Sequence, residues 1–258
     1  MTNPLLDPGA RLVIGHRGAA AEAPENTMAS FERAAELGVD ALEFDVHVTA
    51  DGHAVVIHDP TLRRTTDRDG AVAALTLEQL RAADAGARFT RGGATFPFRG
   101  RGVRVPTVEE VLERFPSMPL LIELKTAAAA GALRRAIERH GAQDRCVIGC
   151  FEDAALVPFR APPWHATASQ RDVLRFLAHI LFGARMDGTR YEVLSVPPAW
   201  HGLPLPVRLM ATSARALGRP VHIWVVDRAY LALRLWERGV CGIITNDPAA
   251  ILSAVRPA

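Results

Sequence analysis

Short runs of apolar and β-branched residues recur along the chain, and most are followed by a stretch with apolar residues at helical spacing. The runs predict eight strands: Leu12–Gly15, Val39–Val46, Pro119–Leu124, Cys146–Gly149, His165–Ala168, Glu192–Ser195, Val221–Val226 and Cys241–Thr245. The stretches between them predict helices: Thr27–Leu37, Thr107–Phe115, Ala127–His140, Gln170–Phe182, Pro206–Leu217, Arg228–Arg238 and Pro248–Val255. Eight strands that alternate with helices favour an α/β fold of the closed (β/α)8 TIM-barrel type over a doubly wound open sheet.

The stretch from Pro60 to Arg104 interrupts this alternation. It is rich in Arg, Gly and Thr, has one short run at helical spacing at Leu75–Ala83, and is too long for a simple loop. We therefore expect a small inserted subdomain after the second strand, over about residues 60–105. The loops that follow the strands form the active-site face of such a barrel, so the insertion would act as a lid over that face. Residues 1–258 are otherwise expected to form a single domain.

Composition narrows the class of protein. Of the 258 residues, 49% are hydrophobic and 22% are charged, which is typical of globular domains. The net charge of +2 excludes a dedicated nucleic-acid-binding protein, and the longest apolar stretch, Phe176–Gly183, is well short of the ~18 residues of a membrane span. Three cysteines are too few for a disulfide framework, and the N-terminus lacks the pattern of a signal peptide. We therefore expect a cytoplasmic protein, whereas its oligomeric state is not predicted.

Two histidines follow predicted strands at positions typical of catalytic groups. His16 and Arg17 lie between two glycines after the first strand, and His58 ends a strand-like run before a turn. In a parallel barrel such positions lie on the C-terminal rim, where catalytic side chains occur. A surface His and Arg on a loop would give the first motif equally well if it stood alone. The nearby Asn26 and Thr27 are as compatible with capping the first helix as with a catalytic role.

Acidic residues occupy one face of the second predicted strand, in which apolar and polar residues alternate strictly. Glu43 and Asp45 then point into the barrel, where an unpaired carboxylate is costly. On the third strand Glu123 and Lys125 also share a face, so three acids and a lysine meet at the top of the barrel. Three carboxylates with no cysteine nearby suit Mg²⁺ or Ca²⁺ better than zinc. A buried acid–base network that includes Arg17 is the alternative left open by this pattern.

The motifs described so far and several others follow one another along the chain, mostly near the ends of predicted strands. They are His16-Arg17-Gly18, Pro24-Glu25-Asn26-Thr27, Glu43-Phe44-Asp45, His58-Asp59, Arg64-Thr65-Thr66, Glu123-Leu124-Lys125, Trp224 and Gly242–Pro248. Together they resemble the glycerophosphodiester phosphodiesterase family over nearly the whole chain, and Pro97–Thr107 resembles the end of the insertion of its bacterial members. The sequence departs from the family at Val225, where many members have Thr, and at Cys150, where Ser is common. These departures leave open which alcohol is esterified to the glycerophosphate in the substrate.

The resemblance implies a TIM barrel that uses one divalent cation, Mg²⁺ or Ca²⁺, to hydrolyse small-molecule glycerophosphodiesters to an alcohol and sn-glycerol 3-phosphate. The roles that it implies are acid and base for His16 and His58, metal ligands for Glu43, Asp45 and Glu123, and phosphate contacts for Arg17 and Lys125. Trp224, together with Phe151 and Trp200, is expected to form an apolar wall for substrate, although each would also suit the core or the rim.

Three other functions are weighed against this one. A zinc-dependent barrel hydrolase would start from paired histidines on the first strand, whereas Arg17 follows His16. A non-catalytic barrel that binds phosphodiesters would have little use for three acids and two histidines at one rim. Lysophospholipase D-type hydrolysis of lysophospholipids is the nearest alternative, and Phe89, Phe96 and Phe98 in the insertion keep it open.

Overall fold

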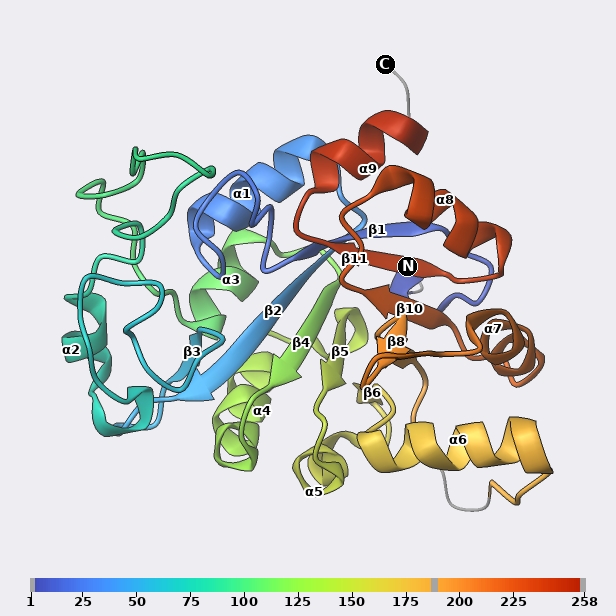
Figure 1. Cartoon of the computed structure of the whole chain (residues 1–258). Coiled ribbons are helices and arrows are strands. Elements are labelled where there is room, and N and C mark those ends of the chain that lie inside the picture. Colours follow the sequence, from blue (N-terminus) through green and yellow to red (C-terminus); the bar gives the residue numbers. More distant parts are fainter. Residues whose placement is uncertain (1–2, 187–189, 256–258) are drawn as a thin grey trace.

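Eight parallel strands curl into a barrel-like sheet in the computed structural model, which describes residues 3–186 and 190–255 (Figure 1). They are β1 (Leu12–His16), β2 (Ala41–Val48), β4 (Leu120–Leu124), β5 (Cys146–Gly149), β6 (His165–Ala166), β7 (Leu194–Val196), β10 (Val221–Trp224) and β11 (Gly242–Thr245). Their order is β6-β5-β4-β2-β1-β11-β10-β7. A parallel bridge between Thr167 and Val193 joins the two ends of this order. The chain thus has a TIM-barrel-like α/β fold.

Helices pack around the outside of the strands (Figure 1). They are α1 (Met28–Leu37), α3 (Val108–Arg114), α4 (Ala130–Arg139), α5 (Asp153–Leu156), α6 (Gln170–Phe182), α7 (Val207–Ala216), α8 (Ala229–Glu237) and α9 (Pro248–Val255). Short 3₁₀ helices are η1 (Pro4–Leu6), η3 (Ala127–Ala129), η4 (Gln143–Arg145) and η5 (Val157–Phe159). Thr27 caps α1 by accepting a hydrogen bond from the Ser30 N–H. No helix in the described part of the chain is both long and apolar enough to cross a membrane.

The predicted strands and long helices are all present, with ends that shift by at most three residues. The structure adds the one-turn helix α5 and a hairpin of β8 (Ala199–Trp200) and β9 (Leu203–Pro204). Elements of two to four residues are too short to produce a readable period in the sequence, which is why the pattern did not predict them.

Apolar side chains form two layers on opposite faces of the barrel strands. Leu42, Phe44 and Val46 of β2 belong to the outer layer, and the ring of Phe44 lies 5.6 Å from that of Phe31 on α1. The inner layer fills the barrel and consists of Leu5, Leu12, Ile14, Ala41, Leu121, Val147, Val193 and Ile244. The strict alternation along β2 therefore sends Glu43 and Asp45 to the inner face, above the apolar filling of the barrel.

The segment between β2 and α3 has a small apolar cluster of its own. It begins with β3 (Ala54–Val56), which runs antiparallel to β2, and contains η2 (Val72–Ala74) and α2 (Leu77–Arg81). Figure 1 shows the segment to one side of the barrel, and Val55, Leu62, Leu80 and Val105 pack within its cluster. The helix predicted at Leu75–Ala83 is shorter than expected, because Thr76 caps it and it ends after Arg81.

Candidate active site

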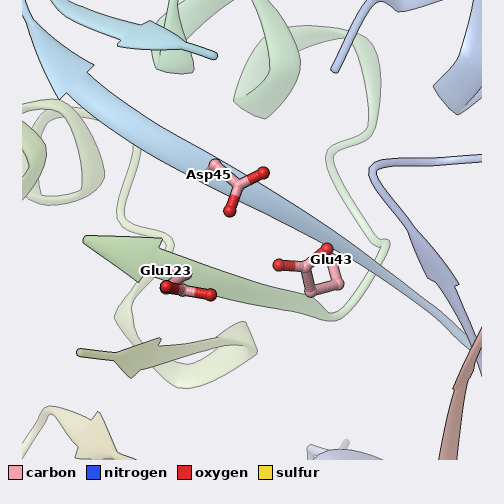
Figure 2. Close-up of side chains that lie close together, drawn as sticks. All are labelled: Glu43, Asp45 and Glu123. Carbon is pink, nitrogen blue, oxygen red and sulfur yellow. The ribbon is translucent and has the colours of Figure 1, made fainter. Parts of the chain in front are cut away.

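Three carboxylates converge at the C-terminal end of neighbouring strands. Glu43 and Asp45 project from β2, and Glu123 projects from β4, where it is the register partner of Asp45 (Figure 2). One oxygen of each lies within 4.8 Å of the others, and Glu43 and Asp45 are buried. The sequence placed these three residues on inward faces, and the structure brings them into one cluster.

The three acids perturb each other's titration. Burial raises the pKa of Glu43 well above its usual range, and the charges of Asp45 and Glu123 raise it further. Burial is also the main cause of the raised pKa of Glu123. Burial acts in the same direction on Asp45, but Lys125 and Arg17 outweigh it and hold the pKa of Asp45 below its usual value. Negative charge at this cluster is therefore only partly compensated by the protein.

Two cations contact the acids directly. Arg17 Nε lies 3.0 Å from Asp45 Oδ2, and Lys125 Nζ lies 2.9 Å from Asp45 Oδ1 and 2.7 Å from Glu123 Oε1. Glu43 accepts a hydrogen bond of 3.0 Å from the Arg17 backbone N–H. These contacts form the acid–base network that the sequence left as an alternative. Three acids against two bases nevertheless suit a hard divalent cation, because carboxylate oxygens are the ligands that Mg²⁺ and Ca²⁺ prefer.

His16 is held through its Nδ1 atom, which lies 2.7 Å from Asn246 Oδ1. Asn246 in turn donates its side-chain and backbone N–H groups to Asp227, at 3.0 and 2.8 Å. This use of the Asn246 amide leaves its carbonyl oxygen to face the histidine, so His16 Nδ1 is the protonated nitrogen. Burial, assisted by the charge of Arg17, lowers the pKa of His16. With the hydrogen on Nδ1, a neutral His16 ring carries its lone pair on Nε2.

His58 is held in the same way but by a charged partner. Its Nδ1 atom lies 2.7 Å from Asp59 Oδ1. Arg64 donates to Asp59 at 2.8 and 3.0 Å, and this contact is the main reason that the pKa of Asp59 falls to about 2. Asp59 is therefore a carboxylate near neutral pH, and it accepts the hydrogen bond of the His58 Nδ1–H.

Arg64 connects the residues around His58 with those around Arg17, and the sequence did not predict this connection. Its guanidinium also donates to both oxygens of Glu25, at 2.7 Å each, and Glu25 accepts a hydrogen bond of 2.8 Å from Arg17. A continuous chain thus runs from Arg17 through Glu25, Arg64 and Asp59 to His58. The motif Arg64-Thr65-Thr66 contributed to the family resemblance, but nothing in the local pattern indicated these partners.

Asn26 is the other residue whose role the sequence left undecided. Its Nδ2 donates to Asp45 Oδ2 at 2.8 Å, and its Oδ1 accepts from the Asp45 backbone N–H at 3.3 Å. Asn26 adopts φ 57°, a left-handed conformation that asparagine tolerates better than most residues. It therefore orients Asp45, while the neighbouring Thr27 caps the helix.

A cavity of about 470 Å³ opens onto this cluster. The predicted site residues His16, Arg17, Glu43, His58, Glu123, Lys125 and Trp224 all line it, and Asp45 lies beneath it with its side chain covered. Phe151 and Trp200 line it as well, and the ring of Phe151 meets that of Trp224 edge-on at 6.0 Å. Among the described residues that line this cavity, none comes from 60–105, and the lid stays a prediction.

Comparison with known proteins places this site in a family. Residues 16–250 match the glycerophosphoryl diester phosphodiesterase family. A glycerophosphodiester phosphodiesterase of Caldanaerobacter subterraneus subsp. tengcongensis is 34% identical over 261 residues, which cover 95% of this chain and 98% of that protein. One of Bacillus subtilis is 29% identical over 95% of this chain and 86% of that protein.

A solved structure is similar over nearly the whole chain. It is a phosphodiesterase of Oleispira antarctica in complex with the product sn-glycerol-3-phosphate, with a TM-score of 0.76 and 26% identity, and the match covers 95% of this chain and 96% of that one. The resemblance drawn from the motifs is confirmed by these matches. The chain belongs to the glycerophosphoryl diester phosphodiesterase family.

Proposed function

We propose that this protein hydrolyses glycerophosphodiesters to an alcohol and sn-glycerol 3-phosphate, with one divalent cation, Mg²⁺ or Ca²⁺, at Glu43, Asp45 and Glu123. The observation that carries the proposal is the convergence of three carboxylates and two oriented histidines on one cavity. The names of the relatives and the product held by the Oleispira enzyme support the same substrate class. When bound, the cation would neutralise the acids and polarise a phosphate oxygen.

His16 is assigned the role of general base. Its Nδ1–H is held by the uncharged Asn246 carbonyl, and burial favours the neutral ring. Its Nε2 lone pair is therefore available to accept a proton from the nucleophile, which is water or the free glycerol hydroxyl of the substrate. The second nucleophile would give a transient cyclic phosphate.

His58 is assigned the role of general acid. Asp59 Oδ1 lies 2.7 Å from its Nδ1 and fixes the orientation of the ring. Its Nε2–H would then donate to the oxygen of the departing alcohol, so no alkoxide has to leave. The two roles differ because His16 has an uncharged partner, Asn246, and His58 has a charged partner, Asp59.

Arg17 and Lys125 are assigned to the phosphate oxygens, and Trp224 to the wall beside the substrate. Lys125 has three N–H donors, of which two are used on Asp45 and Glu123. Arg17 likewise retains donors beyond those on Asp45 and Glu25. Such donors, fixed before the reaction, offset the negative charge that develops on the phosphoryl oxygens.

Residues 60–105 are proposed to be an inserted subdomain that braces the site, within a single domain of residues 1–258. Arg64 supports this function through Asp59 and Glu25. Arg91 fastens the same segment to the loop after β1, because its Nη2 donates to the Glu22 carbonyl at 2.9 Å.

The direct test is hydrolysis of a panel of glycerophosphodiesters, followed by ³¹P NMR, in Mg²⁺, in Ca²⁺ and in EDTA. We expect sn-glycerol 3-phosphate to appear with one of the two cations and not with EDTA. Arg17→Ala should lower kcat/KM by a factor of ~10² or more, as for loss of one preorganised donor. Arg11→Ala, in an exposed residue outside the cavity, is the matched control. Binding of the diesters without turnover would instead identify a non-catalytic barrel.

A further inference from the structure

The inner face of β2 carries a third polar side chain beyond the two acids, that of His47. It alternates with apolar residues in the same way as Glu43 and Asp45, and only 6% of it is exposed. His47 does not line the cavity, so it does not contact a substrate bound there. A buried polar ring outside the cavity needs a partner within the protein.

The partner of His47 is the main chain of His58. The Nε2 atom of His47 lies 3.1 Å from the His58 carbonyl oxygen. A carbonyl oxygen can only accept a hydrogen bond, so the His47 ring carries a hydrogen on Nε2 and donates it. The backbone of the residue proposed as general acid is therefore tied to the strand that holds Glu43 and Asp45.

The side-chain partner of His58 belongs to the same turn as His58 itself. Asp59 holds the Nδ1 atom of the ring, but it is the next residue in the chain. Asp59 therefore orients the ring relative to the turn, and other contacts must place the turn relative to the acids. Arg64 links Asp59 to Glu25, which lies on the loop after β1 and not on β2.

Two contacts join the turn directly to β2. His47 is opposite Val55 in the ladder between β2 and β3, and the Ile57 N–H donates to the Asp45 carbonyl at 3.0 Å (Figure 1). His47 makes the contact one residue further along, at the His58 carbonyl. Its side chain thus extends the attachment to β2 as far as His58, and so sets the distance between His58 and the acid cluster.

We infer that His47 is a positioning residue for His58, and that it holds the proposed acid at its distance from the phosphate by donating its Nε2–H to the His58 carbonyl. This inference rests on the proposed phosphodiesterase function and adds a residue to it. An error of about 1 Å in the position of a reacting group can lower the rate by about 10²-fold. Loss of the donor should therefore slow proton transfer to the departing alcohol and leave substrate binding nearly unchanged.

Two substitutions of His47 separate its role as a donor from its role in filling space. His47→Met keeps a side chain of similar bulk without a donor, whereas His47→Gln can bring an amide N–H close to the position of Nε2. We expect His47→Met to lower kcat for a glycerophosphodiester by a factor of about 10–100 at a nearly constant KM, and His47→Gln to restore most of the activity. Equal losses of kcat in the two variants, or a rise in KM alone, would overturn the inference.

A second substrate and a double variant test whether the effect passes through His58. With a p-nitrophenyl leaving group, which needs no proton, most of the loss in His47→Met should disappear. In the background of His58→Ala, His47→Met should lower kcat no further, because the two residues act as one unit. His53→Met, in an exposed histidine outside the cavity, is the matched control and should keep the kinetics of the wild type. Losses at His47 and His58 that multiply would overturn the inference.

The hydrogen on Nε2 can be observed in the wild-type protein even if His47→Met does not fold. A long-range ¹H–¹⁵N spectrum at a pH where the ring is neutral, with the signal assigned by its loss in His47→Gln, should show His47 protonated at Nε2 and not at Nδ1. The opposite tautomer would overturn the inference, because Nε2 could then not donate to the carbonyl. Failure of the proposed function would look different: the wild-type protein would hydrolyse no glycerophosphodiester, and the tautomer of His47 would be unchanged.

Discussion

The two histidines of the cavity differ in the charge of the group that holds each ring. Asn246 presents a carbonyl oxygen to His16, whereas Asp59 presents a carboxylate to His58. A carboxylate stabilises an imidazolium more than a carboxamide does, since it adds a Coulombic attraction to the hydrogen bond. Two rings of the same residue type are therefore suited to opposite halves of a proton transfer.

His16→Ala and His58→Ala should each lower turnover of a glycerophosphodiester by a factor of roughly 10²–10⁴. On a substrate whose leaving group is p-nitrophenol, which needs no proton, His58→Ala should recover most of its activity and His16→Ala should not. Steady-state kinetics on both substrates measures this. His53→Ala, in an exposed histidine outside the cavity, is the control. Equal losses for both variants on both substrates would contradict the division of roles.

Arg64 acts on the site through other residues, as it contacts Asp59 and Glu25 and does not line the cavity. Arg64→Ala should lower kcat by a factor of about 10–100, the range typical of groups that orient a catalytic side chain. Because Asp59 is then less well fixed, most of this loss should disappear with the p-nitrophenyl substrate, which does not depend on the acid. If Arg64 acted only on folding, its loss would lower kcat on both substrates by the same factor.

The matched control for this variant is its neighbour. Arg63 is exposed and pairs with Asp69, away from the cavity. Arg63→Ala should keep the kinetics of the wild type on both substrates. Arg64→Lys should restore only part of the activity, because an ammonium cannot reproduce the paired contacts that the guanidinium makes with two carboxylates.

At the scale of elements, the loop between β1 and α1 determines how the site is assembled. Gly18 lies at φ 89°, and a Cβ there would come within 2.5 Å of the Ser30 backbone on α1. The loop can therefore pack closely on the helix only with glycine at this position. This approach sets the Arg17 backbone N–H against Glu43 and the Asn26 amide against Asp45. The loop thus fixes two of the three acids.

The strand β10 contains a buried histidine that the site does not use. His222 is completely buried, and burial lowers its pKa to about 4. The unfolded chain takes up a proton at this ring below about pH 6.5, whereas the folded chain does not until about pH 4. The stability that depends on His222 is therefore intact above pH 6.5 and decreases as the pH falls toward 4, by about 3 kcal/mol in total.

This linkage predicts that His222→Leu, which cannot titrate, gains stability relative to the wild type as the pH falls. The difference in free energy of unfolding between the two proteins should shift by about 2–3 kcal/mol between pH 7.5 and 4.5. Urea denaturation at both pH values measures it. Comparison of the two proteins cancels the titration of the carboxylates elsewhere in the chain. A difference that does not change with pH would show that the ring is protonated equally in the folded and unfolded states.

At the scale of the whole molecule, a cation bound at the proposed site would couple its binding to the stability of the fold. The pKa of Glu43 is raised by burial and by its acidic neighbours, so the metal-free fold carries an electrostatic strain that a cation would relieve. A cation at 100 times its Kd would stabilise the fold by about 2.7 kcal/mol. For a chain of this length that corresponds to a rise in Tm of roughly 5–10 °C.

Thermal unfolding in EDTA and in saturating Mg²⁺ or Ca²⁺ checks this prediction without any measurement of activity. Glu43→Gln should abolish the rise in Tm with cation, and in EDTA it should unfold at the same temperature as the wild type or higher. Glu36→Gln removes an exposed acid on α1 and should keep the full rise. If the cation raised the Tm of Glu43→Gln as much as that of the wild type, Glu43 would be excluded from the cation site.

Much of the fold and part of the site could be predicted from local pattern. Strand and helix positions follow from periods of 2 and 3.6 residues, and the alternation along β2 places Glu43 and Asp45 on the inner face. His16 and His58 were selected because they end strand-like runs, which is a property of neighbouring residues. Such features are fixed by the covalent geometry of a few consecutive residues, so they can be read without knowing the rest of the chain.

The partners of these residues were decided only by the tertiary structure. Asn246 is 230 positions from His16, and Glu25 is 39 positions from Arg64, yet both pairs are in hydrogen-bond contact. The cavity lining likewise combines residues of α6, of the end of β7 and of a hairpin that leaves no periodic signal. Closure of the barrel brings these segments together, because it sets every strand end on one rim whatever the separation in sequence. The sequence by itself determined which side chains reach that rim, and the closed barrel determined which of them meet.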